Sequence, residues 1–156
     1  MPNFSLSPLS PDDVALAYPL VRMAMPDVQL EDWRSYMTCL LSAGGGVLTL
    51  VAPDGGIHAL ACWNVEQHLR HDLVLKVDTF VAFELSHRAP ARAALCDGLQ
   101  SLADELGCTT VLFTLESRGL IPAHSPALEG WRKLGSELEA VQLARPVNPE
   151  VSRLVS

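Results

Sequence analysis

The segment over residues 73–115 constrains the fold more than any other part of this chain. Its pattern indicates an apolar strand, a cationic turn, an amphipathic helix and a second apolar strand. Leucines recur along one face of the helix expected over residues 89–106, and Gly107 can end that helix in a left-handed conformation. These leucines are Leu95, Leu99, Leu102 and Leu106. Two buried strands joined by a crossover helix form a right-handed βαβ unit, so we predict that the strands over 73–83 and 109–115 pair in parallel.

The turn before this helix is cationic. Arg88 and Arg92 lie where the helix begins, and helix N-termini carry partial positive charge and unpaired N–H groups. The two arginines therefore oppose the helix dipole unless an anion binds there. Ligands of βαβ units bind at the carboxyl ends of the strands, where this turn lies. The pattern favours a phosphate-bearing ligand, with a solvated charged turn as the alternative.

Composition narrows the class of protein. The chain has 156 residues, of which 49% are hydrophobic, so it can bury one good core and we expect a single domain over residues 1–156. A formal net charge of -7 argues against a nucleic-acid partner. No apolar run is long enough to cross a bilayer, and the N-terminus does not read as a signal peptide. We therefore expect a cytoplasmic protein without a membrane partner.

The remaining elements alternate between short strands and helices. Strands are expected over residues 4–9, 47–52, 57–63 and 138–144, and further helices from Ser10, from about Leu30 and from Ser125. Pro19 should kink or shorten the first of these helices. The order predicts an α/β (α+β) domain whose central sheet is mixed, mostly antiparallel and flanked by helices.

This order of elements, with these lengths, resembles the GNAT-type N-acetyltransferase superfamily over nearly the whole chain. Three segments carry the resemblance: the strand–turn–helix over 80–107, the strand over 109–115, and residues 127–135, which look like the family's Ala-x-x-x-Tyr-x-Lys-x-Gly helix ending. The resemblance implies a three-layer GNAT-like domain with acetyl-CoA as co-substrate between two splayed strands. It also implies a pyrophosphate held on a Q/R-x-x-G-x-G/A loop and direct transfer of the acetyl group to an amine.

The family's pyrophosphate loop is degenerate here, and two registers stay open. In one, the loop begins at Arg88 and Ala91 replaces its first glycine; in the other, it begins at His87 and Pro90 replaces that glycine. Backbone amides near the end of the preceding strand are implied to polarise the thioester carbonyl. The residues implied to bind the coenzyme are Val81, Phe83, Arg88, Ala89, Ala91, Arg92 and Ala93.

The acceptor amine needs a route for its proton and a pocket. Carboxylates and a histidine near the expected cleft are candidate catalytic groups, each with a solvated or structural role as the alternative. These candidates are Asp78, Glu84, Glu116 and His124. Trp33 and Tyr36 are implied to line the acceptor pocket, with core packing as the alternative. Trp131 stands where the family often has its general-acid tyrosine, and an indole N–H cannot protonate a thiolate.

Two functions follow from these features. The first is an acyl-CoA-dependent N-acyltransferase that moves an acetyl group from acetyl-CoA to an amine of a small molecule or peptide. The second is a catalytically silent module of the same fold that binds acyl-CoA or a protein partner. We expect no metal site, because no histidines, cysteines or carboxylates have ligand spacing on one face. The scattered cysteines are interpreted as buried thiols, and the oligomeric state is open between a monomer and a homodimer.

Overall fold

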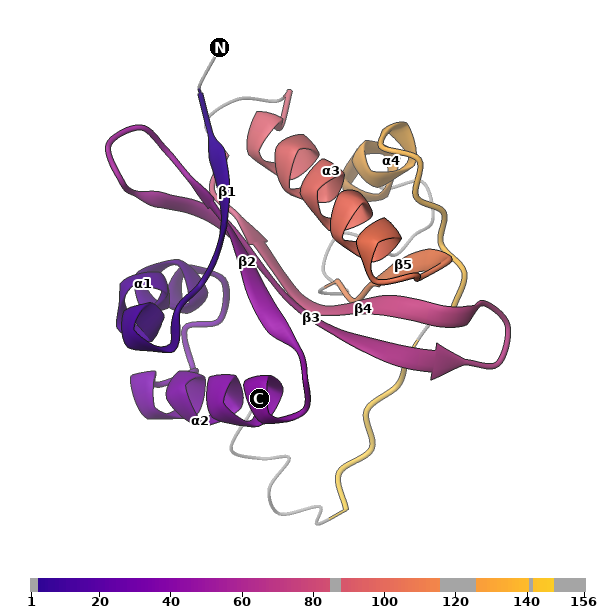
Figure 1. Cartoon of the computed structure of the whole chain (residues 1–156), viewed down its shortest axis with the longest axis horizontal. Coiled ribbons are helices and arrows are strands. Elements are labelled where there is room, and N and C mark those ends of the chain that lie inside the picture. The colour runs from indigo at the N-terminus through magenta and orange to yellow at the C-terminus, as the bar shows by residue number, and fades with distance from the viewer. Residues whose placement is uncertain (1–2, 85–87, 116–125, 141, 148–156) are drawn as a thin grey trace. The chain divides into compact units, whose positions relative to one another are not determined.

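The structure is a computed structural model that describes residues 3–84, 88–115, 126–140 and 142–147. The chain divides into two compact units, residues 1–116 and 117–156. The first unit holds a five-stranded sheet with helices on both of its faces (Figure 1). The described part of the second unit holds helix α4, over Pro126–Lys133.

The sheet of the first unit is mixed and mostly antiparallel, as predicted. Its strands are neighbours in chain order, and the first three pairs are antiparallel whereas β4 and β5 are parallel. The strands are β1 (Ser5–Pro8), β2 (Gly46–Val51), β3 (Ile57–His68), β4 (Asp72–Ala82) and β5 (Thr110–Phe113). The expected α/β fold class is therefore confirmed.

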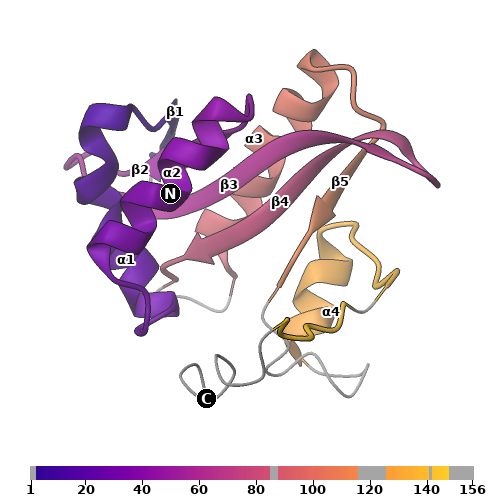
Figure 2. The ribbon, with the colours of Figure 1, turned by 90° about the horizontal axis from the view of Figure 1, so that it is seen from below.

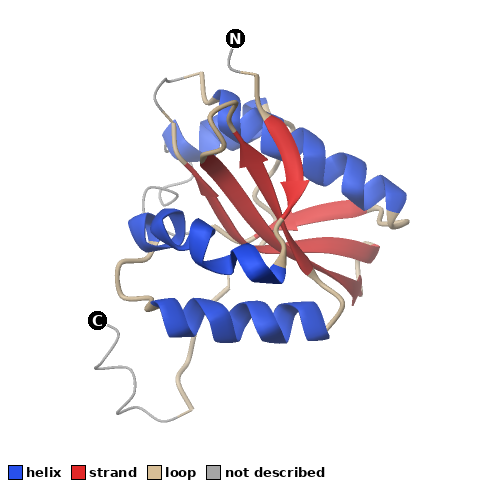
Figure 3. Cartoon of the chain, turned by 60° about the vertical axis from the view of Figure 1, so that its left-hand side comes forward, coloured by secondary structure: helices blue, strands red, loops and turns tan. Residues whose placement is uncertain are grey.

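Helices cover both faces of this sheet (Figure 1, Figure 3). Helices α1 (Val14–Ala24) and α2 (Leu30–Ser42) pack on one face, and α3 (Pro90–Glu105) packs on the other. Adjacent residues of β3 separate the two cores, because side chains alternate between the faces of a strand. Leu60 packs with α1 and α2, whereas Ala59 and Ala61 pack with α3.

The segment that leads into α1 begins at Ser10, where the sequence predicts the start of a helix. A 3-10 turn over Pro11–Asp13 precedes the helix, and the Ser10 hydroxyl accepts a hydrogen bond from the Asp12 N–H at 3.3 Å. The helix continues through Pro19, so of the two expected effects, a kink or a shortened helix, the shortening is wrong. Proline removes the hydrogen bond to the carbonyl four residues earlier, at Ala15. Both Ala15 and Pro19 are exposed, so water can satisfy that carbonyl.

Helix α3 is the crossover of the predicted βαβ unit, and the parallel pairing of β4 with β5 confirms that unit. Leu95 and Leu99 of α3 are fully buried, whereas Leu106, just beyond its last residue, is 40% exposed. Gly107 has a φ of +76°, the left-handed stop expected after this helix. The Thr109 N–H then donates to the Leu73 carbonyl at 2.8 Å, which aligns the start of β5 with β4.

Two expectations for other segments are wrong. The described residues from 138 to 144 form no strand. A strand requires a neighbouring edge that satisfies its backbone N–H and C=O groups, and here Leu138 and Leu143 are 49% and 89% exposed. Cys39 is exposed rather than buried, because it lies two residues past Met37 and so points away from the apolar face of α2.

Candidate functional site

The parallel ladder between β4 and β5 is short. It runs from the pair Val74 and Thr110 to the pair Val77 and Phe113, and the Thr114 N–H donates to the Val77 carbonyl at 2.8 Å. Strand β5 ends with this ladder at Phe113, whereas β4 continues to Ala82 and leads away from β5 (Figure 2). In the part of the chain that the structure describes, the recorded pairing with β5 therefore stops in the middle of β4.

A β-bulge in β4 coincides with this divergence. In the pairing of β3 with β4, Cys62 is opposite Thr79 and Trp63 is opposite Val77, so Asp78 is an extra residue. Bulges bend the strand that carries them and increase its twist. The bulge follows directly on Val77, the last β4 residue of the parallel ladder, and so bends β4 where it leaves β5.

The N-terminus of α3 lies just after the end of β4 in the sequence. Ala89 is the N-cap in a left-handed conformation, with φ 48° and ψ 54°, and it provides no side-chain cap. An outside carboxylate provides the cap instead, because the Arg92 N–H donates to Glu84 Oε1 at 2.7 Å. This internal anion accounts for the charge conflict that the sequence indicates at the start of the helix.

The residues around the start of α3 that were expected to bind the coenzyme differ in how far they are exposed to solvent. Arg88 is exposed ahead of α3, whereas the Ala91 methyl group is buried against the sheet. Ala89 and Ala93 are half-buried, and the Ala93 N–H donates to the Ala89 carbonyl at 3.1 Å. In the first turn, Pro90 has no N–H and the Arg92 N–H already donates to Glu84, so Ala91 carries the other first-turn donor. The alternative loop register begins at His87, which lies outside the described residues.

The backbone of β4 offers different amides from those expected. Phe83 N–H donates to the His58 carbonyl of β3 at 2.8 Å, and it is therefore engaged within the sheet. Backbone N–H groups alternate between the two edges of a strand, so Val81 also directs its N–H toward β3. The Ala82 N–H points to the β5 side instead. Ala82 lies within the expected segment over residues 81–83, but the sequence could not single it out, because no side-chain pattern reports the direction of an amide.

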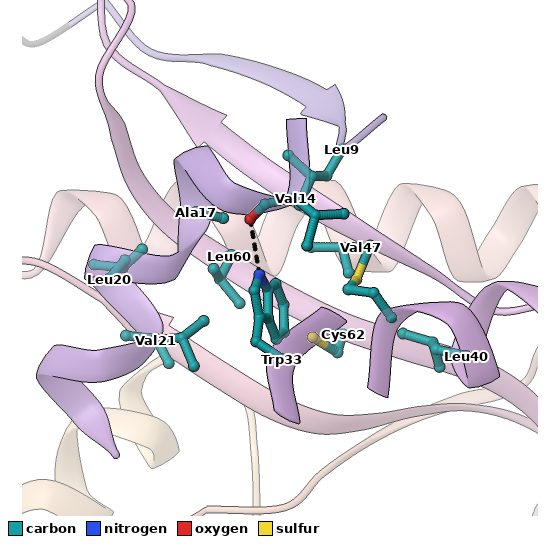
Figure 4. Close-up of a cluster of buried hydrophobic side chains, with 12 residues drawn as sticks. Leu9, Val14, Ala17, Leu20, Val21, Trp33, Leu40, Val47, Leu60 and Cys62 are labelled. Carbon is teal, nitrogen blue, oxygen red and sulfur yellow. Dashed lines mark hydrogen bonds between the residues drawn. The ribbon is translucent and has the colours of Figure 1, made fainter. Parts of the chain in front are cut away.

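Of the two aromatic residues expected in the acceptor pocket, Trp33 belongs to the core. It is 2% exposed, and its Nε1 donates to the Val14 carbonyl at 2.8 Å, which ties α2 to α1 (Figure 4). Tyr36 stacks on Trp33 with ring centroids 6.2 Å apart and is 36% exposed. Trp33 therefore packs in the core, as the alternative interpretation holds, whereas Tyr36 is exposed enough to line an acceptor pocket.

Tyr36 and the candidate base Asp78 are brought together beside the bulge. Burial raises the pKa of Tyr36 to about 12, Cys62 and Asp78 add to this rise, and a side-chain hydrogen bond with Thr79 opposes it. Burial likewise raises the pKa of Cys62 to about 12, with Thr79 lowering it and Asp78 raising it. Tyr36 therefore keeps its proton at neutral pH and can serve there as a hydrogen-bond donor.

A small ionic network extends from Asp78 along β3 and β4. Lys76 Nζ lies 3.8 Å from Asp78 Oδ1 and 3.6 Å from Glu66 Oε2. Asn64 Nδ2 donates to Glu66 Oε1 at 3.0 Å, and its Oδ1 is buried without a hydrogen-bond partner among the described residues. Two carboxylates thus surround one ammonium group, so the network carries net negative charge.

The other candidate residues lie apart from this cluster or outside the described ranges. Glu84 is engaged at the α3 N-terminus, and Glu116 and His124 fall outside the described residues. Trp131 is buried within the second unit, in α4. No group of three or more His, Cys, Asp or Glu residues in the described ranges could hold a metal ion. No helix there is long and apolar enough to span a membrane.

This chain is similar to known proteins in its structure, but not detectably in its sequence. No family model matches the chain, and no curated protein sequence matches it. Aminoglycoside N-acetyltransferase AAC(6')-Iy in complex with CoA matches with a TM-score of 0.76 and 13% identity over 95% of this chain and 97% of that chain. An acetyltransferase from Trypanosoma brucei matches with a TM-score of 0.69 and 17% identity over 93% of this chain and 100% of that chain. Glucosamine-6-phosphate N-acetyltransferase from Arabidopsis thaliana matches with a TM-score of 0.68 and 13% identity over 94% of this chain and 99% of that chain. With its parallel strands β4 and β5 joined by a crossover helix, the chain has the fold of the GNAT-type N-acetyltransferases.

Proposed function

We propose that this chain is an acyl-CoA-dependent N-acyltransferase, acting as one domain, that transfers an acetyl group from acetyl-CoA to an amine of a small molecule or peptide. The observation that carries the proposal is that the parallel ladder stops at Val77, next to the Asp78 bulge, while β4 continues to Ala82 without β5 beside it and leads on to the crossover helix α3. A structure of the same fold holds CoA, and two of the matching structures are N-acetyltransferases of amino sugars by their printed names.

In this proposal, the coenzyme is held mainly by backbone and by Arg88. Its pantetheine arm lies against the β5-facing edge of β4, where the Ala82 N–H is directed. Its pyrophosphate lies at the first turn of α3, where the N–H groups of Ala91 and Arg92 and the helix dipole favour negative charge. The guanidinium of Arg88 adds a charge-assisted contact.

The reaction in this proposal is a direct attack. The amine nitrogen attacks the thioester carbonyl carbon, a C–N bond forms, the C–S bond breaks, and the coenzyme leaves as a thiolate. Asp78 accepts the proton released by the amine, and water protonates the thiolate, because the Trp131 indole cannot. Tyr36 donates a hydrogen bond that orients the acceptor, and the net negative network of Glu66, Lys76 and Asp78 favours a cationic amine.

The second candidate is a silent module that binds acyl-CoA or a protein partner. Three observations favour it. The Arg92 N–H already donates to Glu84, and Pro90 removes one backbone donor from the loop. Trp131 stands where the resembled family often has its general-acid tyrosine. Both candidates require the same fold, and they differ in whether bound acetyl-CoA turns over.

The test combines binding with turnover. Thermal shift and calorimetric titration use acetyl-CoA, longer acyl-CoAs, free CoA and pantetheine, and thiol release is then followed with a panel of amines. Binding with thiol release supports the acyltransferase, whereas binding without thiol release by any amine supports the silent module. Absence of all CoA binding would exclude the acyltransferase and an acyl-CoA-binding module, and it would favour a module that binds a protein partner.

The role of Asp78 is tested with Asp78→Asn. This variant is expected to lower kcat by about 10²-fold or more while leaving the affinity for acetyl-CoA unchanged, because only the proton acceptor is lost. Asp97→Asn, an exposed residue of α3, makes the same charge change and should leave kcat unchanged. Full activity of Asp78→Asn would exclude Asp78 as the base.

A further inference from the structure

Glu84 caps α3 from outside the helix. It follows the last residues of β4 and reaches the Arg92 N–H at 2.7 Å, eight residues along the chain. The backbone just before it is held in place, because the Phe83 N–H donates to the His58 carbonyl at 2.8 Å. The carboxylate is therefore a tethered anion, present at the helix N-terminus at high effective concentration.

The first turn of α3 has few backbone donors to share. Pro90 has no N–H, and the Ala93 N–H is donated to the Ala89 carbonyl at 3.1 Å. Only Ala91 and Arg92 remain among the first four residues of the helix, and Glu84 engages one of these two. A phosphate that approaches this turn meets the Glu84 carboxylate, which already accepts from the Arg92 N–H. The two negative charges repel each other at such short range.

We infer that Glu84 is an internal anion that competes with the phosphates of the coenzyme for the N-terminus of α3. The inference rests on the proposed function, since it assumes that the coenzyme binds at this turn. When the site is empty, Glu84 satisfies the Arg92 N–H and the helix dipole. When the coenzyme binds, its pyrophosphate replaces the carboxylate, and Glu84 turns toward solvent.

This competition predicts opposite effects of one substitution on two measurements. Glu84→Gln keeps an oxygen that can accept from the Arg92 N–H but removes the negative charge. The empty protein should lose part of the interaction with the helix dipole, so its unfolding midpoint should fall by about 1 to 4 °C. Affinity for CoA should rise roughly three- to tenfold, because the phosphates no longer displace a charged competitor. A group with only a structural role would lower both quantities.

The experiment titrates CoA and pantetheine into the parent chain, Glu84→Gln and a matched control, and it records the unfolding midpoint of each empty protein. The control is Glu105→Gln, which makes the same charge change at the exposed last residue of α3, about 20 Å from Arg92 along the helix axis. Glu105→Gln should leave both affinities unchanged and should not lower the midpoint, because an acid at a helix C-terminus opposes the dipole.

Each outcome decides the inference. Tighter CoA binding by Glu84→Gln alone, with pantetheine binding unchanged, supports the competition. Equal or weaker CoA binding by Glu84→Gln overturns it and leaves the proposed coenzyme site standing. A gain that extends to pantetheine, or that Glu105→Gln shares, also overturns it, because the effect would not be local to the phosphates. If neither the parent nor Glu84→Gln binds any CoA species, the proposed function fails, and this inference fails with it.

Discussion

The cores on the two faces of the sheet differ in composition. The core under α3 combines large apolar side chains with small residues, with Ala59 and Ala61 of β3 and Ala91 of α3 buried there and Gly98 of α3 facing β1. A Cβ at Gly98 would lie 2.6 Å from Leu6 Cδ1 and 3.3 Å from Leu48 Cδ2, so the missing side chain at Gly98 leaves room for these two leucine side chains. The core under α1 and α2 instead brings polar groups with raised pKa values together, the Tyr36 hydroxyl of α2 and the Cys62 thiol of β3, beside Trp33 and Met37.

We interpret this difference as a division between positioning backbone groups, on the α3 side, and supplying reactive side chains, on the side of α1 and α2. Close packing of α3 holds the backbone donors of its first turn in a defined position relative to β4. The opposite face places side-chain chemistry beside the Asp78 bulge, where Tyr36 and Thr79 meet. We therefore expect substitutions under α3 to act through geometry and substitutions on the other face to act through chemistry.

The largest expected effect is on stability under α3. Leu99→Ala should lower the free energy of unfolding by about 2 to 5 kcal/mol, because it leaves a cavity in a fully buried position. Leu106→Ala, at a 40% exposed position, is the control and should cost far less. Urea denaturation measures both. Equal costs at the two positions would show that α3 is not the tightly packed helix.

The next effect is on coenzyme binding at the start of α3. Arg88→Glu should weaken acetyl-CoA binding by about 1.5 to 3 kcal/mol, the value of a charge-assisted hydrogen bond, with little change in stability. Arg34→Glu, an exposed position on α2, makes the same charge change and should have little effect on binding. Calorimetric titration compares the two. Similar losses in both variants would point to net charge rather than to a local contact.

A smaller effect is expected from pH on the face under α1 and α2. The pKa of Cys62 is raised from 9.0 to about 12 by burial, so its contribution to stability is complete below pH 9 and is lost as the pH rises toward 12. Between pH 7 and pH 10, the parent should lose about 1.4 kcal/mol of unfolding free energy more than Cys62→Ala loses. Cys39→Ala, at an exposed position, should keep the parent's alkaline loss. Identical losses in the parent and Cys62→Ala would contradict the burial argument.

The smallest effect separates chemistry from packing on that same face. Tyr36→Phe should cost about 0.5 to 1 kcal/mol of stability and raise KM for the amine roughly two- to fivefold, with acetyl-CoA affinity unchanged. Tyr18→Phe is its control, because the Tyr18 hydroxyl donates to the Val28 carbonyl at 2.7 Å, and its loss should cost stability alone. Steady-state kinetics distinguish the two. A rise in KM in both variants would mean that Tyr36 acts through the fold.

The order of the elements in the first unit could be predicted from the sequence because its signals are local. The leucine repeat marks α3, the glycine after it marks the end of that helix, and the Pro53–Gly56 segment marks the hairpin between β2 and β3. The expected strand over 138–144 failed for a nonlocal reason. Its apolar residues resemble a strand, but pairing requires an edge that the sequence does not specify.

The candidate site was less predictable because its decisive features depend on geometry between segments. Arg88 and Arg92 pointed to an anion at the start of α3, yet no spacing rule connects Glu84 to a helix that begins six residues later. The bulge at Asp78 carries no glycine or proline signal. Trp33 and Tyr36 lie close together on α2, and only their burial tells a core residue from a candidate pocket residue.

The parallel ladder between β4 and β5 also has a consequence for how the chain folds. The hairpin of β3 and β4 closes over a short turn, with His68 paired to Asp72, so it can form early at little cost in loop entropy. Strand β5 can pair with β4 only after the intervening chain, which includes α3, has been brought back to the sheet. Contacts between residues far apart in sequence form more slowly than local ones. We therefore expect the divergence of β4 from β5 to be set late in folding, so a chain stalled before that step would hold a formed hairpin but no place for a ligand.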